Sequence, residues 1–170
     1  MDSSSYMVKS NGMLLVKAEP EHLIEFSRTV SAENKLELRE FYNLNPAQAI
    51  LGLIGDDSVN SVIYKDKVVC LTSIDSSGLM WALFSADINK NGIRFVRASF
   101  SLMEYYHLKH NQIECRVWIK GGKTLQWLAF LGFEPIGVST SPTNHQYVTF
   151  VRCDCARAHT KDELLRPVVH

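Results

Sequence analysis

Residues 112–137 read QIECRVWIKGGKTLQWLAFLGFEPIG, and this stretch decides the fold. Its first seven residues alternate between polar and apolar types, which is the period of a strand with two distinct faces. The middle part places Leu125, Leu128 and Ala129 at helical spacing. Gly132 then supplies the left-handed residue that ends a helix. The stretch therefore predicts a strand, a short helix and a second strand.

The composition indicates one compact domain. The chain has 170 residues, and 46% of them are hydrophobic, which is enough for a sizeable core. The 18 basic and 18 acidic residues give a formal net charge of zero. No long-range basic field therefore exists to attract nucleic acid or an anionic membrane, and we expect neither as a partner.

The sequence carries no sign of export or of a structural metal. No apolar run approaches the roughly 18 residues of a membrane span, and the serine-rich start does not resemble a secretory signal. We therefore expect a protein that is not secreted, with its four cysteines as thiols. Cys153, Cys155 and His159 offer three soft ligands, fewer than the four of a structural zinc site, so we expect no metal.

Capping and turn residues divide the rest of the chain. Ser31 is a candidate helix cap, and Asn45 followed by Pro46 is a strong helix start. The expected strands are residues 13–17, 59–64, 68–73, 79–84 and 146–152, and the expected helices are residues 20–28, a second after 31, a third after 45, and 92–108.

This order predicts a mixed α/β sheet covered by helices. The long helix at residues 92–108 would bury the side that carries Ile93, Val96, Phe100 and Met103. Residues 1–10 are polar and are expected to form a flexible lead.

The element order and the Leu-Gly-Phe sequence at residues 131–133 together resemble the GNAT acyltransferase fold. The resemblance implies a mostly antiparallel mixed sheet with helices on both faces and a splayed central pair of parallel strands. It would place the domain at residues 11–153, followed by a polar tail at residues 154–170.

A narrower resemblance is carried by MWALFSAD at residues 80–87, SLMEYYHLKH at residues 101–110, and VWIKGG with LQWLAFLGF further on. These segments are similar to small GNAT-like proteins of short-tailed phages, which are internal virion or morphogenesis proteins. The resemblance implies a phage structural protein or a host protein as partner. It also implies a location in the host cytoplasm or the virion.

The GNAT resemblance implies an acetyl-CoA site. In that family the cofactor lies between the two diverging parallel strands, and its pyrophosphate binds backbone N–H groups at the start of the long helix. Such a helix end offers unpaired donors and a positive dipole end. The matching positions here are Leu83, Phe84, Ser85, Asn89, Lys90, Asn91 and Gly92. Lys90 would add charge toward phosphate, and Asn89 or Asn91 would cap the helix.

The chain departs from the family pattern at four positions. The phosphate turn has the single glycine Gly92, and Asp87 would repel an anion there. Leu128 stands where the family often has a tyrosine as general acid, and a leucine cannot protonate a leaving thiolate. Gly121 stands where an asparagine often precedes the last helix.

Glu114 is the candidate catalytic residue. It lies on the strand that would flank the acyl group, where a carboxylate can act through water as a base on a substrate amine. The alternative is that Glu114, Arg116 and Trp118 form a half-exposed polar face with an ordinary cross-strand pair.

Two functions follow from these observations. The departures favour a phage-type pseudoenzyme with a degenerate acetyl-CoA site, acting in virion assembly or by binding a partner. The element order favours an active N-acyltransferase that transfers an acetyl group from acetyl-CoA to an amine on a protein or small molecule.

Overall fold

The computed structural model describes residues 6–154, which form one eight-stranded sheet in the order β1-β2-β3-β4-β5-β6-β8-β7. Neighbouring strands are antiparallel except β5 and β6, which are parallel. The strands are β1 Tyr6–Ser10, β2 Met13–Lys17, β3 Asn60–Tyr64, β4 Lys67–Ile74, β5 Leu79–Phe84, β6 Gln112–Trp118, β7 Glu134–Thr140 and β8 Gln146–Cys153. The helices are α1 Pro20–Thr29, α2 Ala32–Glu40, α3 Pro46–Leu51, the 3-10 helix η1 Ala86–Lys90, α4 Gly92–His107 and α5 Gly122–Phe130.

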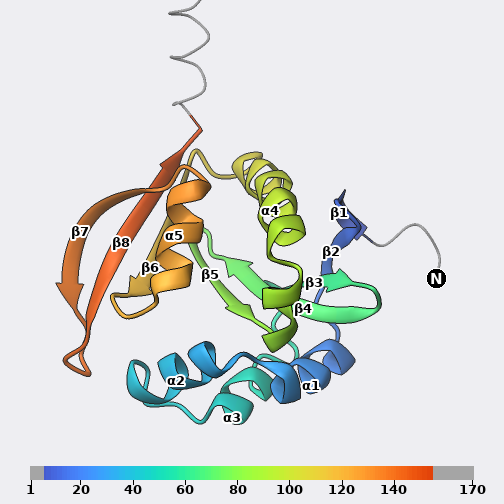
Figure 1. Cartoon of the computed structure of the whole chain (residues 1–170), viewed down its shortest axis with the longest axis horizontal. Coiled ribbons are helices and arrows are strands. Elements are labelled where there is room, and N and C mark those ends of the chain that lie inside the picture. The colour runs from blue at the N-terminus through green and yellow to red at the C-terminus, as the bar shows by residue number, and fades with distance from the viewer. Residues whose placement is uncertain (1–5, 155–170) are drawn as a thin grey trace, which may run out of the picture.

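The sheet separates two hydrophobic clusters. Figure 1 shows α1, α2 and α3 grouped together, apart from α4 and α5. Phe26 of α1 and Ile50 of α3 pack in one cluster, and Met103 of α4 and Leu128 of α5 pack in the other. Strand β5 contributes to both, because successive side chains of a strand point to opposite faces. Its residues at 81 and 83 join the α1–α3 cluster, and those at 80, 82 and 84 join the α4–α5 cluster.

The expected helix caps are confirmed. The Ser31 side chain accepts a hydrogen bond from the Asn34 backbone N–H, and the Asn45 side chain accepts one from Gln48. Gly132 has a φ of +81°, as the predicted end of α5 requires. The strand, helix and strand expected from residues 112–137 are present as β6, α5 and β7.

The expectation of a flexible lead over residues 1–10 is wrong for the part that the structure describes. Residues 6–10 form β1, which pairs with β2 from Ser10 opposite Met13. The turn between these strands is Asn11-Gly12, and both residues have positive φ values. This dipeptide is a strong hairpin signal, because a tight hairpin turn needs two left-handed residues. Residues 1–5 lie outside the described part, as does nearly all of the tail expected at 154–170.

The expected face of α4 is only partly buried: Met103 is fully buried, as expected, but the other three residues are not. Ile93 is 74% exposed, and Val96 and Phe100 are only partly buried. The fully buried stripe instead carries Phe95, Ala98, Ser99, Leu102, Met103, Tyr106 and His107. Both stripes are apolar at helical spacing, so periodicity alone did not decide between them.

None of the helices within residues 6–154 has both the length and the apolar character needed to cross a membrane.

The packing of α1 predicts that substitutions on its buried side destabilise the protein more than substitutions on its exposed side. We expect Phe26→Ala to lower the free energy of unfolding by about 3–5 kcal/mol, because Phe26 is fully buried and its loss leaves a cavity. Ile24→Ala is the matched control on the same helix, since Ile24 is 41% exposed and should cost less than about 1 kcal/mol. Urea unfolding followed by circular dichroism measures both. Equal losses would contradict the packing described.

Candidate functional site

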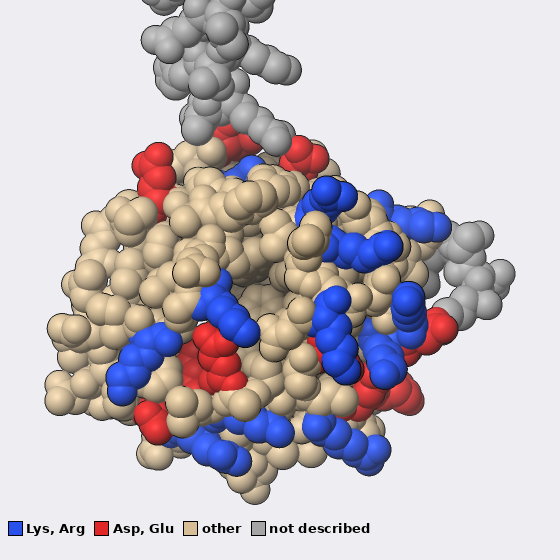
Figure 2. All heavy atoms as spheres, viewed as in Figure 1, with Lys and Arg blue, Asp and Glu red and all other residues tan. Residues whose placement is uncertain are grey.

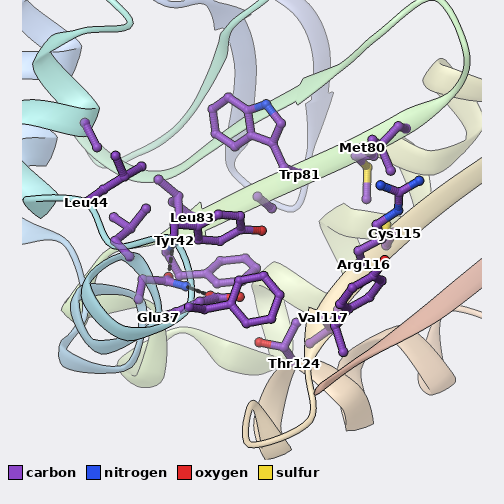
Figure 3. Close-up of a pocket in the computed structure, with 18 of the residues that line it drawn as sticks. Glu37, Tyr42, Leu44, Met80, Trp81, Leu83, Cys115, Arg116, Val117 and Thr124 are labelled. Atoms are coloured by element: carbon purple, nitrogen blue, oxygen red, sulfur yellow. Dashed lines mark hydrogen bonds between the residues drawn. The ribbon is translucent and has the colours of Figure 1, made fainter. Parts of the chain in front are cut away.

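The parallel pair β5 and β6 opens after two residues. Leu79 pairs with Glu114 and Met80 with Cys115, and no further pairs follow between these strands. A cavity of about 530 Å³ lies at the opening. Residues of β5, β6, α2, α5 and the β7–β8 turn line it. Figure 3 shows Glu37 and Tyr42 on one side of this space and Val117 and Thr124 on another.

The open edge of β5 is closed at its far end by α2. In the antiparallel pair of β4 and β5, every second residue of β5 bonds to β4, as Leu79 and Ser85 do at its two ends. The backbone groups of Ala82 and Phe84 therefore point to the other side, toward the opening. The Phe84 N–H donates to Asn34 Oδ1 at 2.8 Å, and the Phe84 carbonyl accepts from the Ser31 N–H at 2.8 Å. The N–H and carbonyl of Ala82 remain directed into the cavity, with no strand of residues 6–154 beside them.

Three polar residues on one side of α2 connect the β5 backbone to the cavity. Ser31, Asn34 and Glu37 are spaced by three residues, which places them on one side of the helix. Asn34 is 4% exposed, and its Nδ2 donates to Glu37 Oε2 at 3.1 Å. The same amide therefore holds both the β5 backbone and the Glu37 carboxylate.

Burial raises the pKa of the Glu37 carboxyl above its ordinary value of 4.5. The hydrogen bond from Asn34 opposes this shift, nearby Glu33 adds to it, and a backbone hydrogen bond from Trp118 opposes it. Partial burial also raises the pKa of Tyr42, and the negative charge of Glu37 contributes. The cavity thus contains a carboxylate that accepts a proton more readily than an exposed one, beside a phenol that stays protonated at neutral pH.

Helix α5 lines the opposite side of the cavity. Thr124 and Leu128 are four residues apart, so both face the same way and both line the cavity. Leu128 is 1% exposed. The Trp127 ring packs edge-on against Phe84, with centroids 5.4 Å apart. Since Phe84 and Leu128 belong to the α4–α5 cluster while Glu37 lies on α2, the cavity passes through the sheet.

The expected cofactor residues lie in two places. Leu83 and Phe84 line the cavity, whereas those at positions 85–92 are not among its lining residues. Ser85 is buried, and its N–H donates to the Val69 carbonyl. The turn that follows is the 3-10 helix η1, and α4 begins at Gly92. These residues therefore form the connection between the cavity and the start of α4.

The polar side chains of this connection have partners within the chain. Lys90 Nζ lies 3.3 Å from Asp87 Oδ1, and Lys123 Nζ donates to Asn89 Oδ1 at 3.2 Å. Asn91 occupies the N-cap of α4 but makes no side-chain cap, so the expected capping by Asn89 or Asn91 is not present. Figure 2 shows a hollow in this face of the molecule, with Lys and Arg side chains on its rim.

Glu114 lies beside the cavity but is not among the residues that line it. Its Oε1 accepts a hydrogen bond from Arg116 Nε at 3.0 Å, and Arg116 does line the cavity. This pair runs along one strand and does not cross between strands. Trp118 is buried, so the expected half-exposed face does not extend to it. Within residues 6–154, no three His, Cys, Asp or Glu side chains gather as metal ligands.

Sequence reasoning missed Glu37. Charged residues alternate with apolar ones along α2, so no single carboxylate stands out. The available signal was the spacing Ser31-x-x-Asn34-x-x-Glu37, which extends a helix cap into a polar ladder.

Comparisons with known proteins identify the fold. No family profile matches the sequence, and no curated protein sequence matches it. A GNAT-family acetyltransferase from Bacillus anthracis aligns with a TM-score of 0.68, at 11% identity, over 86% of this chain and 97% of its own. The ribosomal L7/L12 alpha-N-protein acetyltransferase RimL, in complex with coenzyme A, aligns with a TM-score of 0.67, at 11% identity, over 88% and 98%. The ribosomal-protein-S5-alanine acetyltransferase from Vibrio fischeri gives 0.61, at 14% identity, over 86% and 96%.

The class that these features define is the GNAT acetyltransferase fold: a mixed sheet with one splayed parallel pair and helices on both faces. The fold expected from the sequence is confirmed.

The position of Glu37 predicts a pH-dependent difference in stability. A raised pKa means that the folded state binds the proton more tightly, so this carboxyl favours folding below pH 4.5 and loses that contribution as pH rises through the folded pKa. We expect Glu37→Gln to gain stability relative to the unmodified protein between acidic and neutral pH. Thermal unfolding across this range measures it, with Glu40→Gln at the exposed end of α2 as control. A constant difference would contradict the burial of this carboxyl.

Proposed function

We propose that this protein is an acyl-CoA-dependent N-acyltransferase in which Glu37 is the general base. The observation that carries the proposal is the cavity at the open β5–β6 pair, with a partly buried carboxylate of raised pKa on its α2 side. Perturbed carboxyl groups in a cavity are candidates for acid–base roles. The RimL structure, which has this fold, contains coenzyme A.

The residues present fit acetyl-CoA at two places. The N–H and carbonyl of Ala82 point into the opening and can bond an amide-bearing chain laid along β5, as a neighbouring strand would. The first N–H groups of α4, at Gly92, Ile93 and Arg94, have no partner inside the helix and no Asn91 cap. These donors and the positive end of the helix dipole suit phosphate. Acetyl-CoA would supply the acetyl thioester.

The chain's own groups would then act on the acceptor amine. Glu37 takes a proton from the amine nitrogen, which frees its lone pair to attack the carbonyl carbon of the thioester. A new C–N bond would form and the C–S bond would break, with the sulfur taking the electron pair and the remaining excess proton of the nitrogen, so that it leaves as a thiol. Thr124 is placed to donate a hydrogen bond to that sulfur, because it lines the cavity on the same side of α5 as Leu128.

Leu128 does not prevent this reaction. A thiol has an unperturbed pKa of about 8.5, so a thiolate is a moderately good leaving group and needs a donor more than a full proton transfer. The hydroxyl of Thr124, one turn before Leu128, supplies a donor on the same helix side. Leu128 therefore takes the position of the family's usual tyrosine, and Thr124 would take over part of its function.

The role of Glu37 predicts the main activity result. We expect Glu37→Gln to lower kcat by roughly 10²–10⁴-fold, the usual contribution of a general base, while acetyl-CoA still raises the melting temperature. Mass spectrometry of the acetylated amine measures turnover without interference from the chain's own thiols. Glu114→Gln tests the residue expected from the sequence in the same assay. A large loss in that variant with normal activity in Glu37→Gln would overturn the assignment.

The role of Thr124 predicts a smaller effect. We expect Thr124→Val to lower kcat by roughly 10- to 100-fold, because a hydrogen bond to a charged group contributes about 1.5–3 kcal/mol. Thr124→Ser keeps the hydroxyl and should retain most of the activity. Normal activity in Thr124→Val with a loss in Thr124→Ser would show that the methyl group, and not the hydroxyl, matters.

A second candidate is a binding protein that has kept the fold without catalysis, which includes the phage assembly role suggested by the sequence. It is favoured by Leu128 at the acid position and by the internal partners of Lys90 and Phe84. Acetyl-CoA should then produce no thermal shift at millimolar concentration. Incorporation of the tagged protein into purified phage particles would support the phage role, and acetylated product with a shift would remove this candidate.

A further inference from the structure

The cavity has an apolar lobe beyond Glu37. Leu44 from the α2–α3 connection, Ala49 of α3 and Leu53 after it lie on one side of this lobe. Trp81 and Leu83 of β5 lie on the other. Figure 3 shows Leu44 and Leu83 toward one end of the cavity, with Trp81 further along β5. The lobe therefore lies on the α1–α3 face of the sheet, since Leu53, Trp81 and Leu83 belong to the α1–α3 cluster.

Few charged side chains line the cavity. Among the described residues that line it, only Glu37 and Arg116 carry a formal charge. Arg116 already has Glu114 at 3.0 Å, and its guanidinium would repel any further cation. Glu37 is thus the single lining carboxylate that can receive a positively charged group.

Phe41 lies one helical turn after Glu37 and packs against two other aromatic rings. Phe41 and Tyr42 pack edge-on with centroids 4.8 Å apart, and Phe41 and Tyr147 with centroids 6.0 Å apart. All three line the cavity. An ammonium group is attracted to aromatic faces as well as to a carboxylate, so this corner suits one amine.

We propose that the acceptor is a small primary amine with a single positive charge and an apolar, preferably aromatic, group. This inference rests on the proposed acyl transfer. The amine lies at Glu37 and the aromatic group fills the lobe between α3 and β5, where its burial favours binding. A polyamine fits poorly, because its second cation would lose water in the lobe with no carboxylate to receive it. An α-amino acid fits poorly, because its carboxylate would lie close to that of Glu37.

An acceptor series tests the inference on the full chain with acetyl-CoA. The probes are phenethylamine, ethylamine, spermidine, phenylalanine and a short peptide with an N-terminal alanine, each followed by mass spectrometry of the acetylated product. We expect kcat/KM for phenethylamine to exceed that of every other probe by about tenfold or more, since even one methylene in an apolar pocket discriminates by 10-fold or more.

Two variants test whether the lobe is what distinguishes phenethylamine from ethylamine. We expect Ala49→Phe, which fills the lobe, to lower kcat/KM for phenethylamine at least tenfold and to leave ethylamine within about threefold. Ala47→Phe on the same short helix is the matched control, because Ala47 is exposed and does not line the cavity. Equal effects of Ala49→Phe on both amines, or equal effects of the two variants, would overturn the placement of the aromatic group.

The remaining outcomes separate this inference from the proposed function. Faster acetylation of spermidine or of the peptide than of phenethylamine would overturn the acceptor class and leave acyl transfer in place. Acetyl-CoA binding with no product from any probe, or no acetyl-CoA binding at all, would overturn both.

Discussion

The separation of β5 from β6 is the constraint on which the rest of the structure depends. After Met80 and Cys115 the two strands no longer pair, so backbone groups that a sheet would normally satisfy face a cavity. Unpaired buried backbone groups are costly, and the chain satisfies those of Phe84 with Ser31 and Asn34 at the start of α2. The end of the sheet and the start of this helix are therefore fixed together.

This connection also determines where the candidate base lies. Asn34 uses its oxygen for the β5 backbone and its nitrogen for Glu37. The carboxylate is thereby held by the same amide that closes the strand edge, and its position follows the geometry of the sheet. A side chain held on a helix that is itself bonded to a strand is better positioned for catalysis than one on a free loop. Helix α2 therefore holds both the edge of β5 and the candidate base.

Much of the fold follows from local chemistry that the sequence displays. The caps at Ser31 and Asn45 and the left-handed Gly132 are confirmed because each depends on neighbours within a few residues. The buried face of α4 follows only in part from the sequence: Met103 lies on it, but a second apolar stripe exists, and contact with the sheet selects the one with Phe95. The strand β1 was missed although Asn11-Gly12 indicates a hairpin, since its polar composition suggested a flexible lead.

The site was less accessible from sequence because its parts come from distant segments. Glu37 and Thr124 are separated by about half of the chain and approach only where the sheet opens. Leu83 and Phe84 were expected at the site from their place on the strand before the turn, and both line the cavity. The Phe84 backbone is bonded to α2, and its ring packs against Trp127. The spacing of Ser31, Asn34 and Glu37 marks a polar side of the helix, but nothing in the sequence of β5 shows which strand edge it meets.

The start of α4 has no side-chain cap, and its turn has a single glycine. The side chains of Asp87 and Lys90 pair with each other, so the repulsion expected from Asp87 is partly neutralised within η1. A Cβ at Gly92 would meet nothing within 4 Å, and its φ is not in the left-handed region, so neither packing nor backbone geometry requires glycine there. What glycine does provide is open access to the first N–H groups of the helix, which Asn91 leaves uncapped. In the proposed acyl-CoA site, phosphate binding would therefore rely on backbone donors and the helix dipole.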